Sequence, residues 1–185
     1  MCLRHWSRQL IGLFEPSEVH TGMPDMLGLC KWLEQTSVGM AVRDSLWLFP
    51  TIETLHLFGI VLLVGSTSAL DLRLLGLSLR NQPVSAVAGR LLPWAWVGFL
   101  VQIVTGALLF SSEATKCYIN MAFRLKMLMI LLAGVNAMVF HWTAYRSVGK
   151  WDDAPSTPIG AKLAGSFSVL LWFGIVAAGR WIAFI

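Results

Sequence analysis

Four long apolar runs restrict the folds open to this chain. They lie near residues 46–70, 91–111, 125–145 and 163–185. An α-helix needs about 20 mainly apolar residues to cross the hydrocarbon core of a bilayer, and each run is long enough. Because lipid cannot hydrogen-bond to backbone groups, a segment that crosses it must be helical. We therefore predict an all-α fold, an integral membrane four-helix bundle.

Composition supports the same class. Of the 185 residues, 56% are hydrophobic and 13% are charged, whereas about 25% of a soluble domain is usually charged. Tryptophan and tyrosine side chains stand near the ends of the runs, as they do at membrane interfaces. These residues are Trp47, Trp94, Tyr118, Trp142, Tyr145 and Trp181. The net charge of +4 comes from scattered basic residues, so we expect membrane lipid and no nucleic acid as a partner.

The chain before the first run divides into two parts. Residues 1–25 mix charges, apolar residues and prolines, and we predict a poorly structured or interfacial lead-in. Residues 26–185 then form a single membrane domain. Its first part, Met26–Val42, carries apolar residues at Leu29, Trp32 and Leu33 before a polar "EQTS". This pattern predicts a short amphipathic helix on the membrane surface.

Basic residues in the connections indicate how the chain is oriented. The first and third connections contain six of them: Arg73, Arg80, Arg90, Arg146, Lys150 and Lys162. The opposite side has Lys31, Arg43 and Lys116, with Arg124 and Lys126 at the start of the third run. By the positive-inside rule both termini face outwards, which means the periplasm for a bacterial inner-membrane protein.

An ionisable pair lies inside the first run, in the stretch "WLFPTIETLHLFG". Glu53 and His56 are three residues apart and therefore neighbours on a helix surface. The depth of each polar residue in the membrane, counted along its helix at about 1.5 Å per residue, predicts a central polar layer and an outer one. The central layer would contain His56, Gln102 and Asn136, with Thr105 one turn from Gln102, and the outer layer Glu53, Lys126, Arg180 and Arg124. We expect Glu53 to pair with Arg180 or Lys126, which leaves positive charge for an anionic partner such as a propionate or lipid headgroup.

Structural roles are the alternative for several of these residues. Gln102 and Asn136 could hydrogen-bond one helix to another, and Lys126 and Arg180 could extend to the interface. His141 lies near the inner end of the third run, roughly 14 Å from His56 along the membrane normal at about 1.5 Å per residue. We therefore interpret His141 as an interfacial residue, or one with a separate inner-side role, rather than as a partner of His56.

Two resemblances add to this interpretation. With its "WLFPTIETLH" and "DLRLLGL" strings, the chain from Trp32 to its end resembles a family of small bacterial membrane proteins of unknown function. The pattern "HLFGIVLLVG" followed by "FRLKMLMILLAGVN" is similar to HemJ-type protoporphyrinogen oxidases and CopD-type copper-resistance proteins. In the HemJ type a first-span histidine and a later lysine are implicated in binding haem b, which here implies His56 and Lys126.

Three functions remain open on these grounds. The first is a redox protein in which His56 binds haem iron, Glu53 orients it, and Lys126 and Arg180 hold propionates. The second is a non-catalytic subunit or a quinone- or lipid-binding carrier that meets a membrane partner or its own copy. The third is a small transporter with a proton relay through Glu53 and His56. A di-iron site would need several further carboxylates, and Glu113 is the only other acid we place near a span. The sequence contains no phosphate loop and no nucleotide-binding motif, so it gives no indication of a soluble-type hydrolase or kinase.

Overall fold

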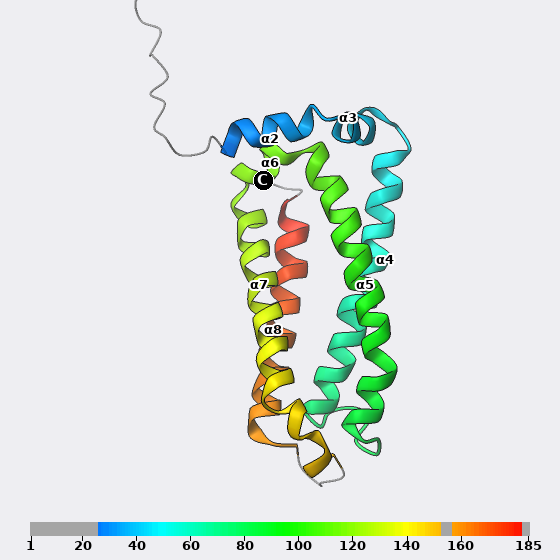
Figure 1. The fold of residues 1–185 in the computed structure, drawn as a ribbon, viewed down its shortest axis with the longest axis vertical. Coiled ribbons are helices and arrows are strands. Elements are labelled where there is room, and N and C mark those ends of the chain that lie inside the picture. The colour runs from blue at the N-terminus through cyan, green and yellow to red at the C-terminus, as the bar shows by residue number, and fades with distance from the viewer. Residues whose placement is uncertain (1–25, 153–156, 183–185) are drawn as a thin grey trace, which may run out of the picture.

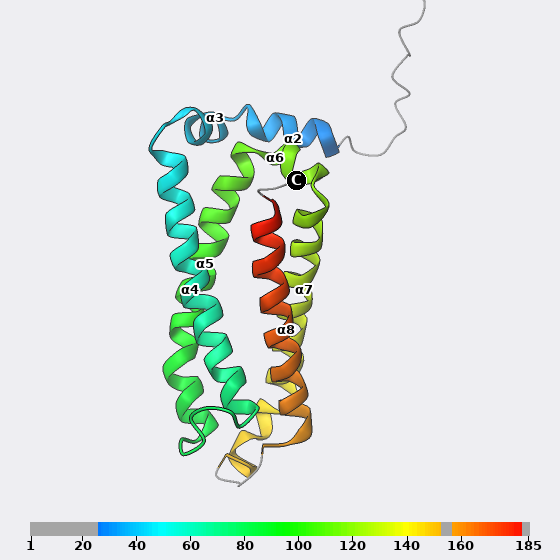
Figure 2. The ribbon, with the colours of Figure 1, turned by 180° about the vertical axis from the view of Figure 1, so that it is seen from behind.

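The computed structural model describes residues 26–152 and 157–182, and over these residues the protein is all-helical. Its four longest helices are α4 (Leu48–Leu74), α5 (Val84–Ser112), α7 (Met121–Trp142) and α8 (Ile159–Trp181). They run along one another as a bundle (Figures 1 and 2). All four are long and apolar enough to cross a membrane. The predicted four-span, all-α architecture is confirmed, while the predicted lead-in at residues 1–25 lies outside the described residues.

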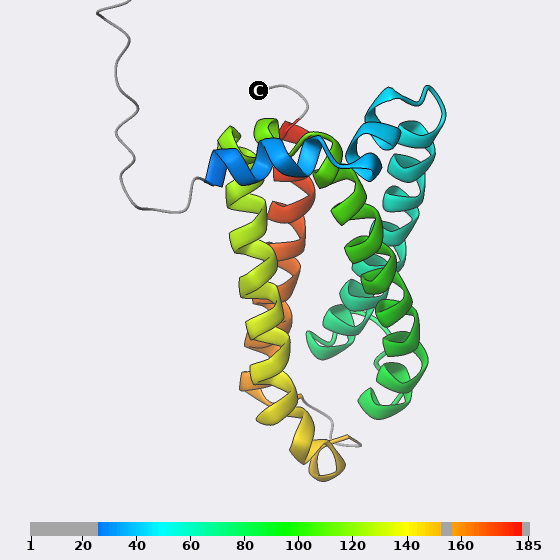
Figure 3. The ribbon, with the colours of Figure 1, turned by 45° about the horizontal axis from the view of Figure 1, so that its top comes forward.

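The bundle consists of two helical hairpins. Helix α4 packs along α5, α7 packs along α8, and contacts between α4 and α8 join the two hairpins. The two helices of the first hairpin approach closely at Gly98 of α5, where an added Cβ would lie 2.6 Å from the backbone nitrogen of Leu63. Figure 3 shows the two hairpins from a tilted direction.

Two apolar clusters hold these contacts together. The larger one, which we call the lower core, joins α4, α5 and α8 and consists of Leu70, Leu74, Val84, Val87, Ala88 and Ala161. The smaller cluster lies between α7 and α8 and consists of Ala133, Leu171 and Ile175. Beyond the lower core, the short helix η1 (Tyr145–Lys150) marks what we call the lower end of the bundle.

Short helices cover the opposite, upper end of the bundle, where α4 begins and α5 ends. The predicted surface helix is two helices, α2 (Met26–Glu34) and α3 (Ser37–Asp44), which lie across this end (Figures 1 and 3). The break comes at Thr36, whose side chain accepts a hydrogen bond from the Gly39 N–H at 3.2 Å and so caps α3. Glu34 Oε1 accepts a bond from the Thr115 N–H at 2.7 Å, which attaches α2 to α6 (Ala114–Ile119).

The long helices extend beyond the apolar runs at some ends. Helix α4 continues to Leu74, past the predicted end at residue 70, because its last turns are buried in the bundle. There the Arg73 Nε–H donates to the Gln82 carbonyl at 2.7 Å. Helix α7 begins earlier than predicted, after Asn120, whose side chain accepts a bond from the Phe123 N–H at 3.2 Å.

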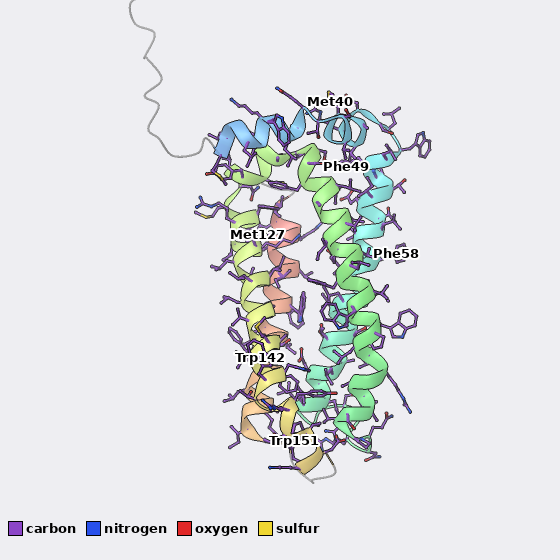
Figure 4. The ribbon with its side chains drawn as sticks, in the orientation of Figure 1. Met40, Phe49, Phe58, Met127, Trp142 and Trp151 are labelled. Carbon is purple, nitrogen blue, oxygen red and sulfur yellow. The ribbon has the colours of Figure 1, made fainter. Side chains whose placement is uncertain are left out.

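The outer surface of the bundle is strongly apolar. Phe173 and Leu170 of α8 are 74% and 70% exposed, and Phe58, Met127 and Trp142 also lie on the outside of the bundle (Figure 4). Soluble proteins rarely expose apolar area on this scale. This surface is therefore the one that lipid covers, and the protein is a multi-pass membrane protein.

Candidate functional site

His56 lies on the side of α4 that packs against α5. Ile52, His56 and Gly59 follow one another at spacings of four and three residues, so they share one face of the helix, and Ile52 and Gly59 are buried. The His56 Nδ1 is 2.8 Å from the Thr105 hydroxyl oxygen on α5. One turn earlier on α5, the Gln102 side-chain N–H donates to the His56 backbone carbonyl at 2.6 Å.

The hydrogen bonds around Thr105 assign the protonation of the imidazole. The Thr105 oxygen is also 2.6 Å from the Val101 carbonyl. Because a carbonyl only accepts, the hydroxyl proton goes to Val101, and the hydroxyl oxygen accepts from His56 Nδ1–H. A neutral His56 ring then has a lone pair on Nε2. That atom has no hydrogen-bond partner among the described residues, and it is not one of the fully buried polar atoms.

Lys126 approaches the same level of the bundle from the other hairpin. The lysine is half-buried on α7, and its side chain crosses the backbone of α8 at Gly179, where an added Cβ would lie 3.7 Å from the Lys126 Nζ. Its positive charge acts on the His56 ring. Gly106 of α5 packs against that ring, since a Cβ there would lie 3.4 Å from His56 Cε1, at ordinary contact distance. We call His56, Gln102, Thr105 and Lys126 the upper polar layer.

An aromatic pair bounds this layer on the side of the upper end. The rings of Phe110 on α5 and Phe123 on α7 are stacked, with centroids 5.6 Å apart and planes 13° apart. Phe110 lies one turn beyond Gly106, and Phe123 comes three residues before Lys126. The stack therefore joins the two hairpins between the upper polar layer and α6.

Beyond this aromatic pair, the Cys117 thiol on α6 is a poor candidate ligand. Burial raises the pKa of Cys117, and the nearby Glu113 carboxylate acts in the same direction. The thiolate is the form that binds metals and attacks electrophiles. Cys30 and Cys117 are both free of disulfides.

The predicted ion pair of Glu53 does not form in the structure. Glu53 is exposed on the outer surface of α4. The ion pairs among the described residues are Arg43–Asp44 and Lys116–Glu113, and neither includes it. The reason is helical geometry: Glu53 directly follows the buried Ile52 and is turned about 100° from it around the helix axis. The expected outer polar layer therefore lacks its acidic member on the inside of the bundle.

The other predicted residues are spread along the bundle. The Asn136 side chain donates to the Ala164 carbonyl at 3.0 Å and so joins α7 to α8, not to His56. Arg180 is in the last turn of α8, next to Gly179. Arg124 is exposed on α7. His141 is stacked on Tyr145 at 5.3 Å near the lower end, which agrees with the prediction that it lies far from His56.

Sequence reasoning missed one buried acid, Asp71. The residue belongs to α4 and is 7% exposed, and its Oδ2 is buried with no hydrogen-bond partner among the described residues. The predicted first run ends at residue 70, so Asp71 falls in the first connection of the sequence-based interpretation. The expectation that Glu113 was the only other acid near a span is therefore wrong. The apolar residues Leu70 and Leu74, at helical spacing around Asp71, were the available signal.

The donor groups limit what this protein can bind at His56. The described residues contain no group of three or more His, Cys, Asp or Glu side chains that could hold a metal ion. One imidazole with one amine from the other hairpin is a weak site for a bare ion. Such a pair suits a ligand that supplies most of its own coordination, as a porphyrin does for iron.

Comparison with known proteins yields a family without an assigned activity. Neither the curated proteins nor the solved structures contain a match to this chain. A family model described as "Family of unknown function (DUF6644)" matches residues 29–185, which include all four long helices and the upper polar layer. Because this match covers most of the chain, the protein belongs to the DUF6644 family, whose function is unknown.

Proposed function

We propose that this protein binds a b-type haem, or a related redox cofactor, inside the membrane, and that the His56 imidazole would hold it. The observation that carries the proposal is the state of the imidazole. Its Nδ1–H is bonded to Thr105 at 2.8 Å, and its Nε2 is left with a lone pair and no partner among the described residues. Metal-binding histidines generally donate their other N–H to an oxygen in this way, which fixes both the tautomer and the ring orientation.

Other residues of the upper polar layer have supporting roles in this proposal. Thr105 orients the ring, and Gln102 holds the His56 backbone through its 2.6 Å bond. Lys126 brings a positive charge to the same level and would hold an anionic propionate of the cofactor. Arg180 lies one residue after Gly179, which Lys126 crosses. When bound, the haem would supply one-electron chemistry, and the protein would supply ligation, charge and a water-poor setting.

The geometry favours this proposal over a proton relay through Glu53. A relay needs its two ionisable groups in hydrogen-bonding sequence, but the Glu53 side chain is exposed on the outside of α4, whereas the bonded ring nitrogen of His56 is directed to α5. A quinone or lipid carrier would use the same layer, with Lys126 as the donor to a carbonyl or phosphate. That second reading predicts a protein without a Soret band.

An absorption spectrum tests the proposal directly. The full chain is produced in haem-replete cells, purified in mild detergent and measured oxidised and after reduction with dithionite. We expect a Soret band and sharpened α and β bands on reduction. His56→Ala should abolish them. Thr105→Val, which removes the acceptor of the Nδ1–H and leaves the imidazole in place, should lower haem retention severalfold.

Two controls make the result specific. His141→Ala changes an exposed histidine near the lower end and should leave the spectrum unchanged. The elution volume and thermal stability of each variant report whether it remains folded. A colourless wild-type protein, or a folded His56→Ala protein with an unchanged spectrum, would contradict the haem proposal. Quinone in an organic extract of the colourless protein would then favour the carrier.

A further inference from the structure

A further ionisable group inside the bundle is Asp71, which packs at the lower core. It lies on α4 between Leu70 and Leu74, which both belong to that cluster, and its residue is 7% exposed. Helix α8 passes directly against it, since a Cβ added to Gly165 would lie 3.3 Å from the Asp71 carbonyl oxygen and 3.6 Å from its Cα. The carboxyl is therefore enclosed by apolar side chains and by the backbone of a neighbouring helix.

This carboxyl has no charged partner among the described residues. Its Oδ2 is fully buried and has no hydrogen bond. On its own helix, Arg73 donates to the Gln82 carbonyl. On α5, Arg90 donates to the Gln82 side chain at 3.3 Å, and Lys162 of α8 takes part in neither of the ion pairs of the described residues.

The remaining charged and polar groups around Asp71 are also accounted for. Asp152, which follows η1, accepts hydrogen bonds from Ser85 of α5. Arg146 and Lys150 of η1 are exposed. On α8, the side chain of Ser168 lies close enough to interact with the Asp71 carboxyl. A hydroxyl is therefore the polar neighbour of this acid, and no cation of the described residues neutralises it.

Buried carboxylates need neutralisation. An ionised carboxylate in a low-dielectric interior is very unfavourable unless it is paired or binds a cation. A protonated carboxyl, in contrast, is neutral and gains an O–H that a hydroxyl or a backbone carbonyl can accept. Asparagine would fill the same volume without this cost. An acid that remains at such a position inside a membrane helix therefore indicates a function.

We propose that Asp71 and Ser168 form a proton-binding site at the α4–α8 contact, which exchanges its proton with the lower membrane surface. Asp71 precedes the last residue of α4 by three positions, about 5 Å along the axis at 1.5 Å per residue, so the path to that surface is short. The proposal is independent of haem. Asp71 and Ser168 do not belong to the upper polar layer, and Asp71 is 15 residues after His56 on α4.

Carbodiimide labelling tests the proposal on the intact protein. Dicyclohexylcarbodiimide is apolar and adds to protonated carboxyls within a membrane, where the product rearranges to a stable N-acylurea. The full chain in lipid vesicles is labelled across a pH series, digested and analysed by mass spectrometry. We expect an adduct on the peptide with Asp71 whose yield falls at least tenfold between acid and alkaline pH. Ser168→Ala should move the pH of half-maximal labelling without abolishing the adduct.

Matched variants and salts decide the outcome. Asp71→Asn is nearly isosteric with the protonated acid and should remain folded and lose this adduct. Glu53→Gln removes the exposed acid of the same helix and should leave labelling at Asp71 unchanged. Absence of the Asp71 adduct at every pH, in a protein labelled elsewhere, overturns the proposal. Protection by millimolar sodium, potassium or lithium chloride at constant ionic strength also overturns it, because the occupant would then be a metal cation.

Discussion

Gly98→Ala is the substitution that most directly tests how α4 and α5 position His56. An alanine Cβ at this position would lie 2.6 Å from the Leu63 backbone nitrogen, 3.0 Å from the Gly59 carbonyl oxygen and 3.0 Å from the Leu62 Cβ. Real Cβ atoms do not approach other atoms within about 3 Å without a shift. Two of the three neighbours are backbone atoms of α4, so a side-chain rotation cannot remove the clash and the helices must separate.

The expected cost follows from overpacking. Extra methyl or methylene groups in a well-packed interior destabilise by about 1–3 kcal/mol. In a chain of this size each kcal/mol lowers the midpoint of thermal unfolding by about 2–4 °C, so we expect a fall of several degrees. Gln102 and Thr105 come four and seven residues after Gly98, on the same face of α5. Separation at Gly98 should therefore also lengthen the bonds that hold His56.

Thermal unfolding in detergent, followed by tryptophan fluorescence, measures this cost. Gly134→Ala on α7 is the matched control, because an added Cβ there meets nothing within 4 Å. It should leave the midpoint unchanged or raise it slightly, since alanine favours the helix more than glycine does. If Gly98→Ala and Gly134→Ala proved equally stable, the close packing of α4 and α5 at this glycine would be refuted.

Two further substitutions test contacts away from the upper polar layer. Asn136→Leu removes the 3.0 Å bond to the Ala164 carbonyl; interhelical bonds in membranes contribute about 0.6 kcal/mol on average and at most about 1.7, so the thermal midpoint should fall by a few degrees and haem content should not change. Asp152→Asn tests a pH effect outside the spans. Burial alone would raise the pKa of Asp152, but hydrogen bonds from the Ser85 hydroxyl, the Ser85 and Val84 backbone N–H groups and the charge of Arg73 hold that pKa below its usual range. The contribution of the Asp152 carboxylate to folding stability is therefore present above the usual carboxyl pKa and is lost as the pH falls through the lowered pKa of the folded protein. The difference in thermal midpoint between wild type and variant should consequently shrink in acid. A difference that grows in acid would contradict this assignment.

The sequence was sufficient to predict the four helices, because a run of about 20 apolar residues has few alternatives to a membrane helix. Counting residues along each helix also placed Gln102 and Thr105 at the membrane depth of His56, and in the structure both residues are hydrogen-bonded to His56. Depth is the quantity that residue counting supplies most directly, since each residue adds about 1.5 Å along the axis.

Direction around the axis could not be predicted in the same way. A helix that is apolar on all sides has no hydrophobic stripe to show which face turns inwards. Glu53 was therefore assigned to the interior because of its spacing from His56, while the structure directs it outwards. The prediction for Asp71 was wrong in the opposite direction. Its charge suggested that it lies in a connection, but the close approach of Gly165 on α8 encloses it. Contacts between helices far apart in the sequence decided both cases.

Helix α4 carries both proposed sites, and a close contact with a different helix lies near each site, so the two sites can be tested separately. Against α5 it meets Gly98 near the upper polar layer, and against α8 it meets Gly165 at Asp71. A Cβ at Gly165 would be 3.3 Å from the Asp71 carbonyl oxygen, so Gly165→Ala should disturb carbodiimide labelling more than the haem spectrum. Gly98→Ala should do the reverse. If either variant altered both readouts equally, α4 would move as one rigid unit between the hairpins, and the two sites would be energetically coupled.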